Sequence, residues 1–496
     1  MALLESHAKI IIVGCGFSGI GMAHRLKESG IEDLIVLERA DEVGGVWEAN
    51  TYPGCTCDVA SHLYSFSFAP NPDWSSTYSA QPEIQAYLRR CADRLDVRRH
   101  LRLGVVLEQA DWSEAEQLWR LQTSAGELTA DVLISAMGPL TEPKLPAVPG
   151  IGSFEGTVMH SARWDHDADL KGKRVASIGT GASAIQYVPK IADETAQLFV
   201  FQRTAPWIMP HGKRPISGFE RALYRRLPLA QRLVRAGVYA SREALVLGFA
   251  KRPKLMGVVA RLARAHREKQ VTDPQLRRDV TPDYTIGCKR MVPSNRWYPA
   301  LTKPNVELVT SALQEIRPRS VVDGAGVERE VDTIIFGTGF KVTEMPAAQH
   351  VRGRDGVLLG DAWDAGPRAY LGTAMPGFPN FFMLLGPNTG LGHSSMVYTI
   401  ESQVEHVLAA IAAMDGAGAR EIEVTPGAHD AFNAKVDARM RGTVWDVGGC
   451  TSFYIDAGGR NATLWPDWTF RFRRLATSFE PSAYRLTAAT RKAVAA

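Results

Sequence analysis

Two glycine-rich segments of this chain combine residue types that can hold a nucleotide. In the first, Gly14, Gly16 and Gly19 follow the apolar run IIIV and open a helix-like stretch, and the next apolar run ends at Glu38. Such glycines allow a tight turn and a close approach to a pyrophosphate, and the acid accepts a hydrogen bond from a ribose hydroxyl. We therefore predict a dinucleotide site with these cofactor-binding residues: Gly14, Gly16, Ser18, Gly19, Glu38 and Arg39.

The second segment repeats the pattern with one change of charge. Gly179 and Gly181 are followed by Ala184, and Arg203 stands 24 positions after Gly179, the same spacing that separates Glu38 from the first glycine of the first segment. An arginine at this place offers a planar fork of donors to the 2′-phosphate of NADP. The alternative is that Arg203 is a solvated residue at a strand end. The segment predicts an NADPH site that includes Gly179, Gly181, Ser183 and Arg203.

Alternating strands and helices must position these residues. Apolar runs within 131–138 and 331–340 each predict a buried strand that leads into a glycine turn, on either side of the second segment. We predict an α/β fold with two Rossmann-like dinucleotide-binding domains and a helical insertion. The predicted limits are 1–150 for the first part of the first domain, 151–331 for the second domain with its insertion at about 213–280, 332–485 for the rest of the first domain, and 486–496 for a C-terminal tail.

The overall composition carries no strong charge bias. The 496 residues include 57 Lys and Arg against 53 Asp and Glu, which gives no argument for binding nucleic acid. The N-terminus has no basic segment followed by a long apolar run, and no apolar run is long enough to cross a membrane. We predict a cytoplasmic protein with no nucleic-acid partner and no metal site.

The six cysteines are too scattered along the chain to predict a disulfide framework. Cys55 and Cys57 lack the CxxC spacing of a redox pair. This spacing disfavours an NADPH-dependent disulfide reductase, one of the enzyme classes that carry two nucleotide folds.

The segment between the two nucleotide folds resembles a known fingerprint. FEGTVMHSARWD, residues 154–165, fits FxGxxxHxxxW followed by Pro or Asp, and is similar to the fingerprint of type I Baeyer–Villiger monooxygenases. Related flavin monooxygenases that oxidise nitrogen or sulfur usually carry Phe or Tyr where this chain has Trp164. A structural alternative is that His160 and Trp164 pack a domain junction. The fingerprint and domain-coupling residues are Phe154, Gly156, His160, Trp164 and Asp165.

Two further segments support the same resemblance. GGVWEANTYPGCTCD, residues 44–58, resembles the family's GGxWxxxxYPGxxxD segment, and GCKRMVPSNRWYPAL, residues 287–301, is similar to its KR segment. The family has SWY near its C-terminus, whereas this chain has Phe453 in place of the Trp, so NADP could be held more loosely. The resemblance adds these cofactor-binding residues: Gly45, Trp47, Asp58, Tyr64, Thr204, Lys289 and Arg290.

The resemblance also implies a reaction. FAD would occupy the first site and NADPH the second, and the enzyme would insert one oxygen of O₂ beside a ketone carbonyl, through a peroxyflavin and a tetrahedral adduct, to give an ester or lactone. Arg290 and Asp58 are the predicted catalytic residues: Arg290 stabilises negative oxygen and Asp58 orients it. Asp58 could instead only cap a loop. His160 could titrate near neutrality, but we expect it to couple domain movement rather than transfer a proton.

The insertion is basic, with fifteen Lys or Arg against three acids between Lys213 and Lys269. Its apolar residues recur at helical spacing. It could be a solvated group of helices, a wall of the substrate entrance, or a surface that makes weak peripheral contact with an anionic membrane.

Two other functions remain open at this point. A flavin monooxygenase that oxidises nitrogen or sulfur is the nearer one, and a non-catalytic NADPH-binding protein, for which Phe453 is the only indication, is the remote one.

Overall fold

The larger of two sheets is built from segments far apart in the sequence. The structure is a computed structural model that describes residues 6–489. Its first sheet has the strand order β17-β4-β5-β6-β1-β2-β3, and β18 also pairs with β6. The strands are β1 (His7–Val13), β2 (Leu34–Leu37), β3 (Leu101–Arg102), β4 (Leu107–Ser113), β5 (Leu118–Thr123), β6 (Gly126–Ser135), β17 (Val351–Arg352) and β18 (Phe381–Met383). The early and late parts of the chain therefore share one sheet.

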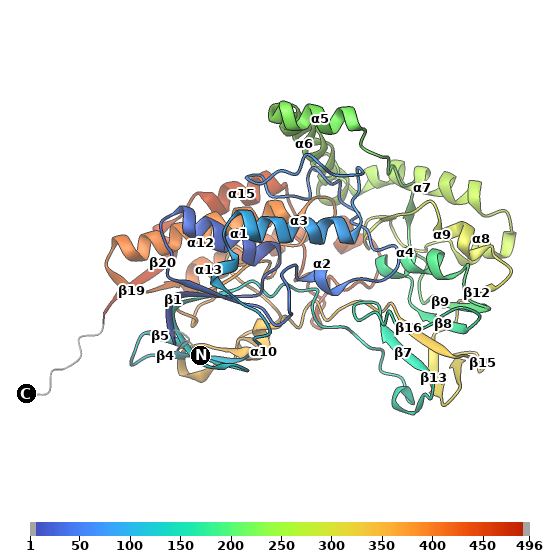
Figure 1. Ribbon diagram of the computed structural model, residues 1–496, viewed down its shortest axis with the longest axis horizontal. Helices are drawn as coiled ribbons and strands as arrows, with labels where there is room; N and C mark the ends of the chain where they lie inside the picture. The colour runs from blue at the N-terminus through green and yellow to red at the C-terminus, as the bar shows by residue number, and fades with distance from the viewer. Residues whose placement is uncertain (1–5, 490–496) are drawn as a thin grey trace, which may run out of the picture.

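Both faces of the first sheet are buried, which explains its continuous apolar runs. Ile10 and Ile12 of β1 belong to one core cluster, while Ile11 and Val13 belong to another, because successive side chains of a strand point to opposite faces. Figure 1 shows α1 and α12 above this sheet, in which β4 and β5 pair antiparallel. The helices of this part are α1 (Phe17–Glu28), α2 (Val46–Ala49), α3 (Gln81–Arg94), α10 (Ala347–His350), α11 (Leu359–Ala362), α12 (Met396–Gly416), α13 (Pro426–Met440), α14 (Val444–Val447) and α15 (Thr469–Thr477).

The second sheet is wholly parallel, with the strand order β12-β9-β8-β16-β7. Its strands are β7 (Thr157–His160), β8 (Arg174–Ile178), β9 (Gln197–Phe201), β12 (Val306–Val309) and β16 (Thr333–Phe336). The helices beside it are α4 (Ala182–Ile191) and α9 (Trp297–Leu301). The remaining strands are β10 (Ile208–Met209), β11 (Val292–Pro293), β13 (Leu313–Arg317), β14 (Ser320–Asp323), β15 (Glu328–Glu330), β19 (Ala419–Val424) and β20 (Tyr484–Ala488).

Two predicted limits need correction. The strand predicted after 331 as a return to the first domain is β16, which hydrogen-bonds β7 and β8 and so completes the second sheet. A buried strand followed by a glycine turn has the same sequence pattern in either sheet. The predicted tail from 486 overlaps β20, which pairs with β19; residues 490–496 lie outside the described part.

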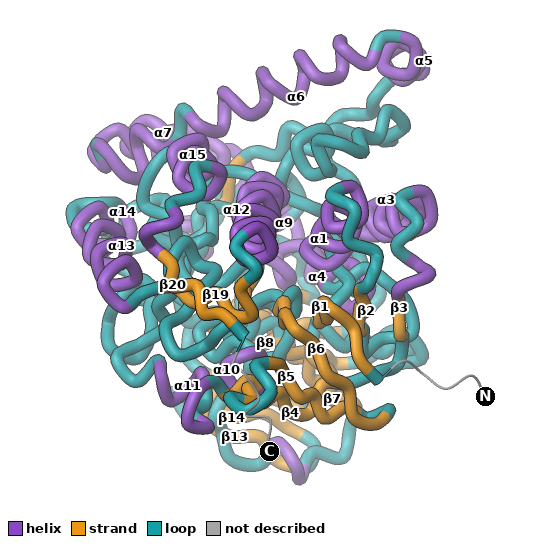
Figure 2. Tube along the Cα trace, turned by 90° about the vertical axis from the view of Figure 1, so that its left-hand side faces the viewer, coloured by secondary structure: helices purple, strands orange, loops and turns teal. Residues whose placement is uncertain are grey.

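The insertion forms helices, as predicted from its periodicity. They are α5 (Gly218–Arg226), α6 (Pro228–Glu243), α7 (Met256–Gln270) and α8 (Pro274–Asp279), with a π-helical segment at Leu247–Lys251 between α6 and α7. Figure 2 shows α5, α6 and α7 along one edge of the molecule, and in Figure 1 they lie above both sheets. No helix within residues 6–489 is long and apolar enough to cross a membrane.

Candidate active site

Arg290 and Asp58 form a two-pronged ion pair between segments that are distant in sequence. Arg290 Nε donates to Asp58 Oδ2 at 2.6 Å and Nη2 donates to Oδ1 at 2.7 Å. The remaining Nη1 donates to the backbone carbonyl of Leu391 at 3.2 Å. Asp58 follows α2 in the first domain, Arg290 precedes β11, and Leu391 follows β18. The pair therefore joins the two domains at the predicted catalytic residues.

The surroundings of this pair keep both charges in place. Burial raises the pKa of Asp58, but the charge and hydrogen bonds of Arg290 outweigh burial and leave that pKa below its usual value. The charge of Asp58 raises the pKa of Arg290 above its usual value, against the effect of burial. The guanidinium is thus a fixed positive charge that can stabilise a negative oxygen without titrating.

The first glycine turn leaves no room for a side chain. Gly14 has φ +101°, and a Cβ added to it would lie 2.7 Å from the carbonyl oxygen of Ala136. A Cβ on Gly19 would lie 1.9 Å from the carbonyl oxygen of Gly14. Gly16 precedes α1, whose N-terminus has no side-chain cap and no acid in its first turn. These free N–H groups suit a phosphate.

The other residues predicted for this site surround the turn. Glu38 ends β2, and its carboxylate accepts hydrogen bonds from the backbone N–H of Cys15 at 2.7 Å and of Ala40 at 3.0 Å. Ser18 is buried in the first turn of α1. Arg39 is exposed, and it donates to Glu142 at 2.8 Å.

A chain of contacts leads from the glycine turn to the ion pair. A Cβ on Gly45 would lie 3.2 Å from the Cα of Gly16, so the two backbones touch. Two residues later, Trp47 Nε1 donates to the hydroxyl of Tyr64 at 3.0 Å. Burial raises the pKa of Tyr64, which also experiences the charges of Asp58 and Arg290. These predicted residues are therefore brought together in one continuous site.

The second glycine turn is built in the same way. Gly179 has φ +106°, and a Cβ on it would lie 2.6 Å from the carbonyl oxygen of Gly337. Gly181 precedes α4, which has no side-chain cap and no acid in its first turn, and Ser183 is half-buried in that turn. Ala184 is fully buried in place of the third glycine.

The cations predicted for the second site lie close enough to influence one another. Burial lowers the pKa of Lys289, and the positive charge of Arg203 lowers it further. Neither cation has an ion-pair partner within the described residues, although Lys289 Nζ lies 4.9 Å from the ring centre of Tyr284. Thr204, next to Arg203, accepts a hydrogen bond from Thr180 at its carbonyl. Two neighbouring cations without a carboxylate partner suit an anion such as a phosphate.

Comparison with known proteins shows to which family this site belongs. Residues 7–227 match the family described as "Flavin-binding monooxygenase-like". A "Baeyer-Villiger monooxygenase" of Streptomyces coelicolor is 48% identical over 484 residues, which cover 97% of this chain and 93% of that protein. The chain belongs to the Baeyer–Villiger monooxygenase family.

Solved structures agree with this assignment. The "cyclohexanone monooxygenase from Rhodococcus sp. Phi1 bound to NADP+" has a TM-score of 0.87 at 28% identity, covering 98% of this chain and all of that chain. The "OTEMO complex with FAD and NADP (form 3)" also has a TM-score of 0.87 at 28% identity, covering 98% of this chain and all of that chain. The predicted family, the α/β fold class with two dinucleotide-binding domains, and the assignment as a monooxygenase are confirmed.

In this monooxygenase the fingerprint segment divides between two places. Phe154 packs in a small core cluster, and Gly156 has no room for a Cβ because the carbonyl oxygen of Asp332 would lie 2.3 Å away. His160 ends β7 beside Phe336 and is buried. Burial lowers the pKa of His160 to about 4, so it is uncharged at neutral pH and does not titrate there as its residue type had suggested.

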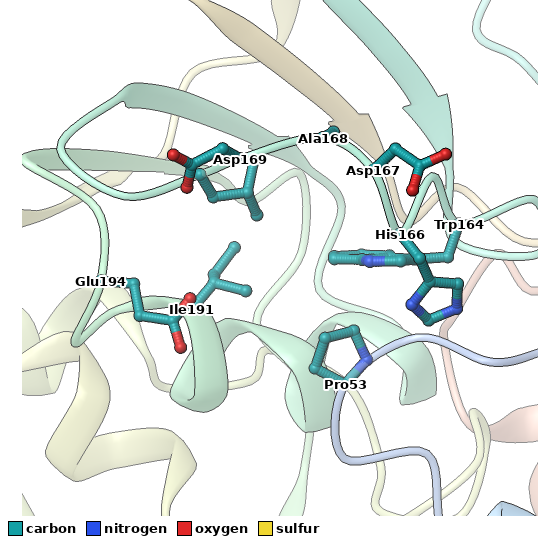
Figure 3. A pocket seen from close by; sticks show the side chains of 9 residues that line it. Pro53, Trp164, His166, Asp167, Ala168, Asp169, Ile191 and Glu194 are labelled. Carbon is teal, nitrogen blue, oxygen red and sulfur yellow. The ribbon is translucent and has the colours of Figure 1, made fainter.

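The second half of the fingerprint lies where the two domains meet. The Trp164 ring packs against that of Tyr187 on α4, at 5.4 Å between centres, and Asp165 accepts a hydrogen bond from the backbone of Asp167. Figure 3 shows Trp164 beside a cavity of about 380 Å³, with Pro53 of the first domain opposite it. His166 Nε2 lies 2.8 Å from Thr51 Oγ1. Neither Arg290 nor Asp58 lines this cavity.

Several residues around the ion pair have no signal in the sequence motifs. Tyr454 is buried beside Arg290; burial raises its pKa, while the charge of Arg290 opposes this. Arg242 ends α6, donates to the hydroxyl of Tyr78 at 2.8 Å, and its charge also lowers the pKa of Asp58. The one sequence signal that could have indicated Arg242 is the helical periodicity of the insertion, which places Arg242 on the inward side of α6. Phe453 is half-exposed and packs on Tyr454.

The cysteines show one pairing that the sequence did not predict. Cys288 and Cys450 form a disulfide, whereas the other four cysteines are free and buried. Burial raises the pKa of Cys55 to about 11, and it also raises the pKa of Cys57. Neither cysteine is therefore a reactive thiolate. This excludes them as a redox pair. Within residues 6–489, no cluster of His, Cys, Asp or Glu could hold a metal ion.

Proposed function

We propose that this chain oxidises a ketone to an ester or lactone, with FAD and NADPH as cofactors and O₂ as co-substrate. The ion pair of Arg290 and Asp58, at the junction of the two dinucleotide-binding domains, carries the proposal. When bound, the flavin accepts electrons from NADPH and activates O₂. The protein must then hold the ketone beside it, exclude water and stabilise negative oxygen.

The cofactors fit the two glycine turns. Gly14, Gly19 and the uncapped N-terminus of α1 would hold the pyrophosphate of FAD, with Glu38 close to its ribose. The corresponding turn at Gly179 would hold NADPH, and Arg203 and Lys289 would bind its 2′-phosphate.

Arg290 is proposed as the group that stabilises charge on the ketone oxygen. Asp58 holds the Nε–Nη2 edge of the guanidinium and so fixes its plane; Nη1 donates one hydrogen to Leu391, which leaves its second N–H for another acceptor. As the carbonyl is attacked, its oxygen gains negative charge, and a positive donor already held in place favours that change without reorganising. Asp58 acts through Arg290 and needs no proton transfer of its own.

Domain coupling is proposed for His160, Trp164 and Asp165. Trp164 and His166 contact residues of both domains, so a rotation of one domain would move this segment. The low pKa of His160 supports a packing role over proton transfer.

Oxidation of nitrogen or sulfur is the competing activity, and one assay separates the two. The purified protein is incubated with NADPH, O₂ and a panel of cyclic, linear and aryl ketones, and in parallel with thioethers and tertiary amines, and products are identified by mass and chromatography. Esters or lactones that gain one oxygen are the expected result. Sulfoxides or N-oxides without any ester would contradict ketone oxidation, and a colourless protein, or a flavin that NADPH does not bleach, would contradict the whole proposal.

A cytoplasmic location is part of this proposal, since O₂, NADPH and a small-molecule ketone are its only required partners.

A further inference from the structure

Helix α6 of the insertion turns its polar side toward the protein. Four of its side chains bind the first domain: Gln231 donates to the carbonyl of Asn71 at 2.6 Å, Arg235 to that of His62 at 2.8 Å, Arg242 to Tyr78, and Glu243 accepts from Thr469 at 2.9 and 2.7 Å. Gln231, Arg235 and Arg242 are spaced by four and by seven residues and so lie on one helical face, and Glu243 directly follows Arg242. Polar contacts thus hold α6 on the molecule, together with apolar packing of Val238 and of Tyr239, whose ring stacks on that of Tyr398.

The outward side of α6 is apolar. Leu229 and Leu233 are 66% and 65% exposed, and Leu247 after the helix is 45% exposed. The exposed positions on this side also include Ala236, Ala240 and Ala244. A helix on the surface of a globular protein normally has the reverse arrangement, with its apolar face inward. The outward face of α6 therefore suits an apolar environment.

The neighbouring helices extend this surface. On α5 and the turn after it, Phe219 is 78% exposed and Leu227 57% exposed. On α7 and just before it, Leu255, Val258 and Leu262 share one helical face and are 47%, 62% and 53% exposed. Figure 2 shows α5, α6 and α7 along one edge of the molecule, and these exposed residues belong to those helices and to the turns beside them. We call this set, from Phe219 to Leu262, the insertion surface.

Unpaired cations accompany the apolar side chains. The exposed cations of the insertion that have no ion-pair partner among residues 6–489 include Arg226, Arg232, Arg252, Lys254, Arg261 and Arg264. Between Lys213 and Lys269 the acids do not balance them, since Glu220 is bound to Arg214 and Glu243 is buried, which leaves Glu268 as the exposed acid of this stretch. The insertion surface therefore combines exposed apolar side chains with cations that have no ion-pair partner.

We propose that the insertion surface docks on the face of an anionic lipid bilayer. Its leucines, Phe219 and valine would enter the boundary between headgroups and acyl chains, and the Arg and Lys side chains would reach the lipid phosphates. A second copy of the chain fits less well, because a symmetric contact places the same patch against itself and so brings cation against cation. The helices would lie on the bilayer rather than span it. This inference is independent of the oxidation chemistry.

The test is sedimentation of the FAD-loaded protein with vesicles of phosphatidylcholine alone and of phosphatidylcholine mixed with phosphatidylglycerol. Binding to the anionic vesicles is expected to exceed binding to the neutral ones at least tenfold, and to fall at about 1 M salt, where the Debye length is about 3 Å. Two double variants are each expected to bind anionic vesicles at least tenfold more weakly: Leu229→Ser with Leu233→Ser, and Arg226→Glu with Arg232→Glu. The controls are Val327→Ser, which changes an exposed apolar residue, and Arg90→Glu with Arg441→Glu, which change exposed arginines; all three residues lie outside the insertion.

Two outcomes would overturn the proposal. One is a wild-type protein that does not sediment with anionic vesicles, or that sediments equally well after the paired Leu→Ser change. The other is a dimer, measured by light scattering, that this same change converts to a monomer, since a second copy would then cover the surface. Product formation from a water-soluble ketone should be unchanged in all these variants, so failure of vesicle binding and failure of the oxidation remain distinguishable.

Discussion

Arg290 and Asp58 bind each other through two hydrogen bonds of 2.6 and 2.7 Å although 232 positions separate them in the chain. Asp58 lies on the loop that begins beside the first glycine turn, and Arg290 directly follows Lys289 of the second cofactor site. Any movement of one domain relative to the other must therefore carry one partner of this pair with it, or break the pair. In the proposed function, the ion pair would link cofactor binding to the orientation of the positive charge of Arg290.

Replacing Arg290 should separate flavin reduction from oxygen insertion. Arg290→Ala removes the fixed positive donor, so we expect ester formation to fall roughly 10²–10³-fold or more. Reduction of the flavin by NADPH, followed by loss of its absorbance in a stopped-flow instrument, should stay within a few fold of wild type. Arg290→Lys keeps the charge but not the fork, and should recover part of the activity. Full ester formation by the alanine variant would remove Arg290 from its proposed role.

Asp58→Asn tests whether Asp58 acts through Arg290. The amide keeps the shape but leaves the guanidinium without its counter-charge, so we expect a loss of product formation smaller than that of Arg290→Ala. In the double variant Asp58→Asn with Arg290→Ala, the Asp58 change should add little, because coupled residues are not additive. Two losses that multiply independently would contradict the coupling.

Arg203 and Lys289 should determine the preference for NADPH over NADH. We expect Arg203→Ala to raise KM for NADPH roughly 10- to 100-fold, since a charge-assisted hydrogen bond to phosphate is lost, and to change KM for NADH little. Lys289→Ala should act in the same direction. Arg319→Ala is a suitable control, because Arg319 is an exposed arginine of the second domain that pairs with Glu155. An equal effect on both nucleotides would exclude a contact with the 2′-phosphate.

The two glycine turns could be predicted, and so could Glu38 and Arg203, which follow the turns at the same spacing, because their chemistry is local. Gly14 and Gly179 need positive φ and close backbone approach, and this requirement appears directly as glycine in the sequence. The roles of Asp58 and Arg290 were inferred from resemblance rather than from spacing. Their mutual contact depends on how the domains pack, which no local pattern encodes.

Other features depend on tertiary structure alone. β16 has the same apolar pattern as a strand of the first sheet, and only its pairing with β7 and β8 assigns it to the second. The inverted polarity of α6 was equally hidden, because periodicity reveals two faces but not which of them points inward. Tyr454 and Arg242 also approach the ion pair, but no sequence motif marks either of them as part of this site.

The Cys288–Cys450 disulfide should stabilise the segment that carries Arg290. Cys288 lies two residues before Arg290, and the backbone N–H of Thr285 also donates to Gly448 at 2.9 Å, so the bond reinforces an existing contact. Removing it with Cys288→Ser and Cys450→Ser is expected to cost roughly 2–5 kcal/mol of stability. A reductant should lower the unfolding temperature of the wild type but not that of the double variant.

The state of this disulfide can be measured by alkylating the unfolded protein and determining its mass. Four labels without reductant and six with it are expected, since four of the six cysteines are free. Six labels without reductant, in protein taken rapidly from cells, would mean that the pair is reduced there, as the thiols of a cytoplasmic protein usually are.

His406 should make the protein sensitive to mild acid. It is buried, its Nδ1 bonds the carbonyl of Ala476 at 3.0 Å and its Nε2 lies 2.6 Å from the hydroxyl of Tyr484, and burial lowers its pKa to about 4. In the unfolded chain a histidine has a pKa of about 6.5. The unfolded state therefore binds more protons between these two values, and stability that is complete above pH 6.5 is lost as the pH falls toward 4.

The loss at pH 5 should be about 2 kcal/mol for this one histidine, and urea unfolding at pH 7 and pH 5 measures it. His406→Gln alters a buried contact, so its stability at pH 7 should be lower than that of the wild type. Because the variant has no titrating ring at this position, the difference in its unfolding free energy between pH 7 and pH 5 should be smaller by about 2 kcal/mol. The exposed His7→Gln is the control and should leave the difference unchanged. An identical pH dependence in wild type and His406→Gln would mean that the ring has the same pKa in the folded and the unfolded protein, contrary to its buried position between Ala476 and Tyr484.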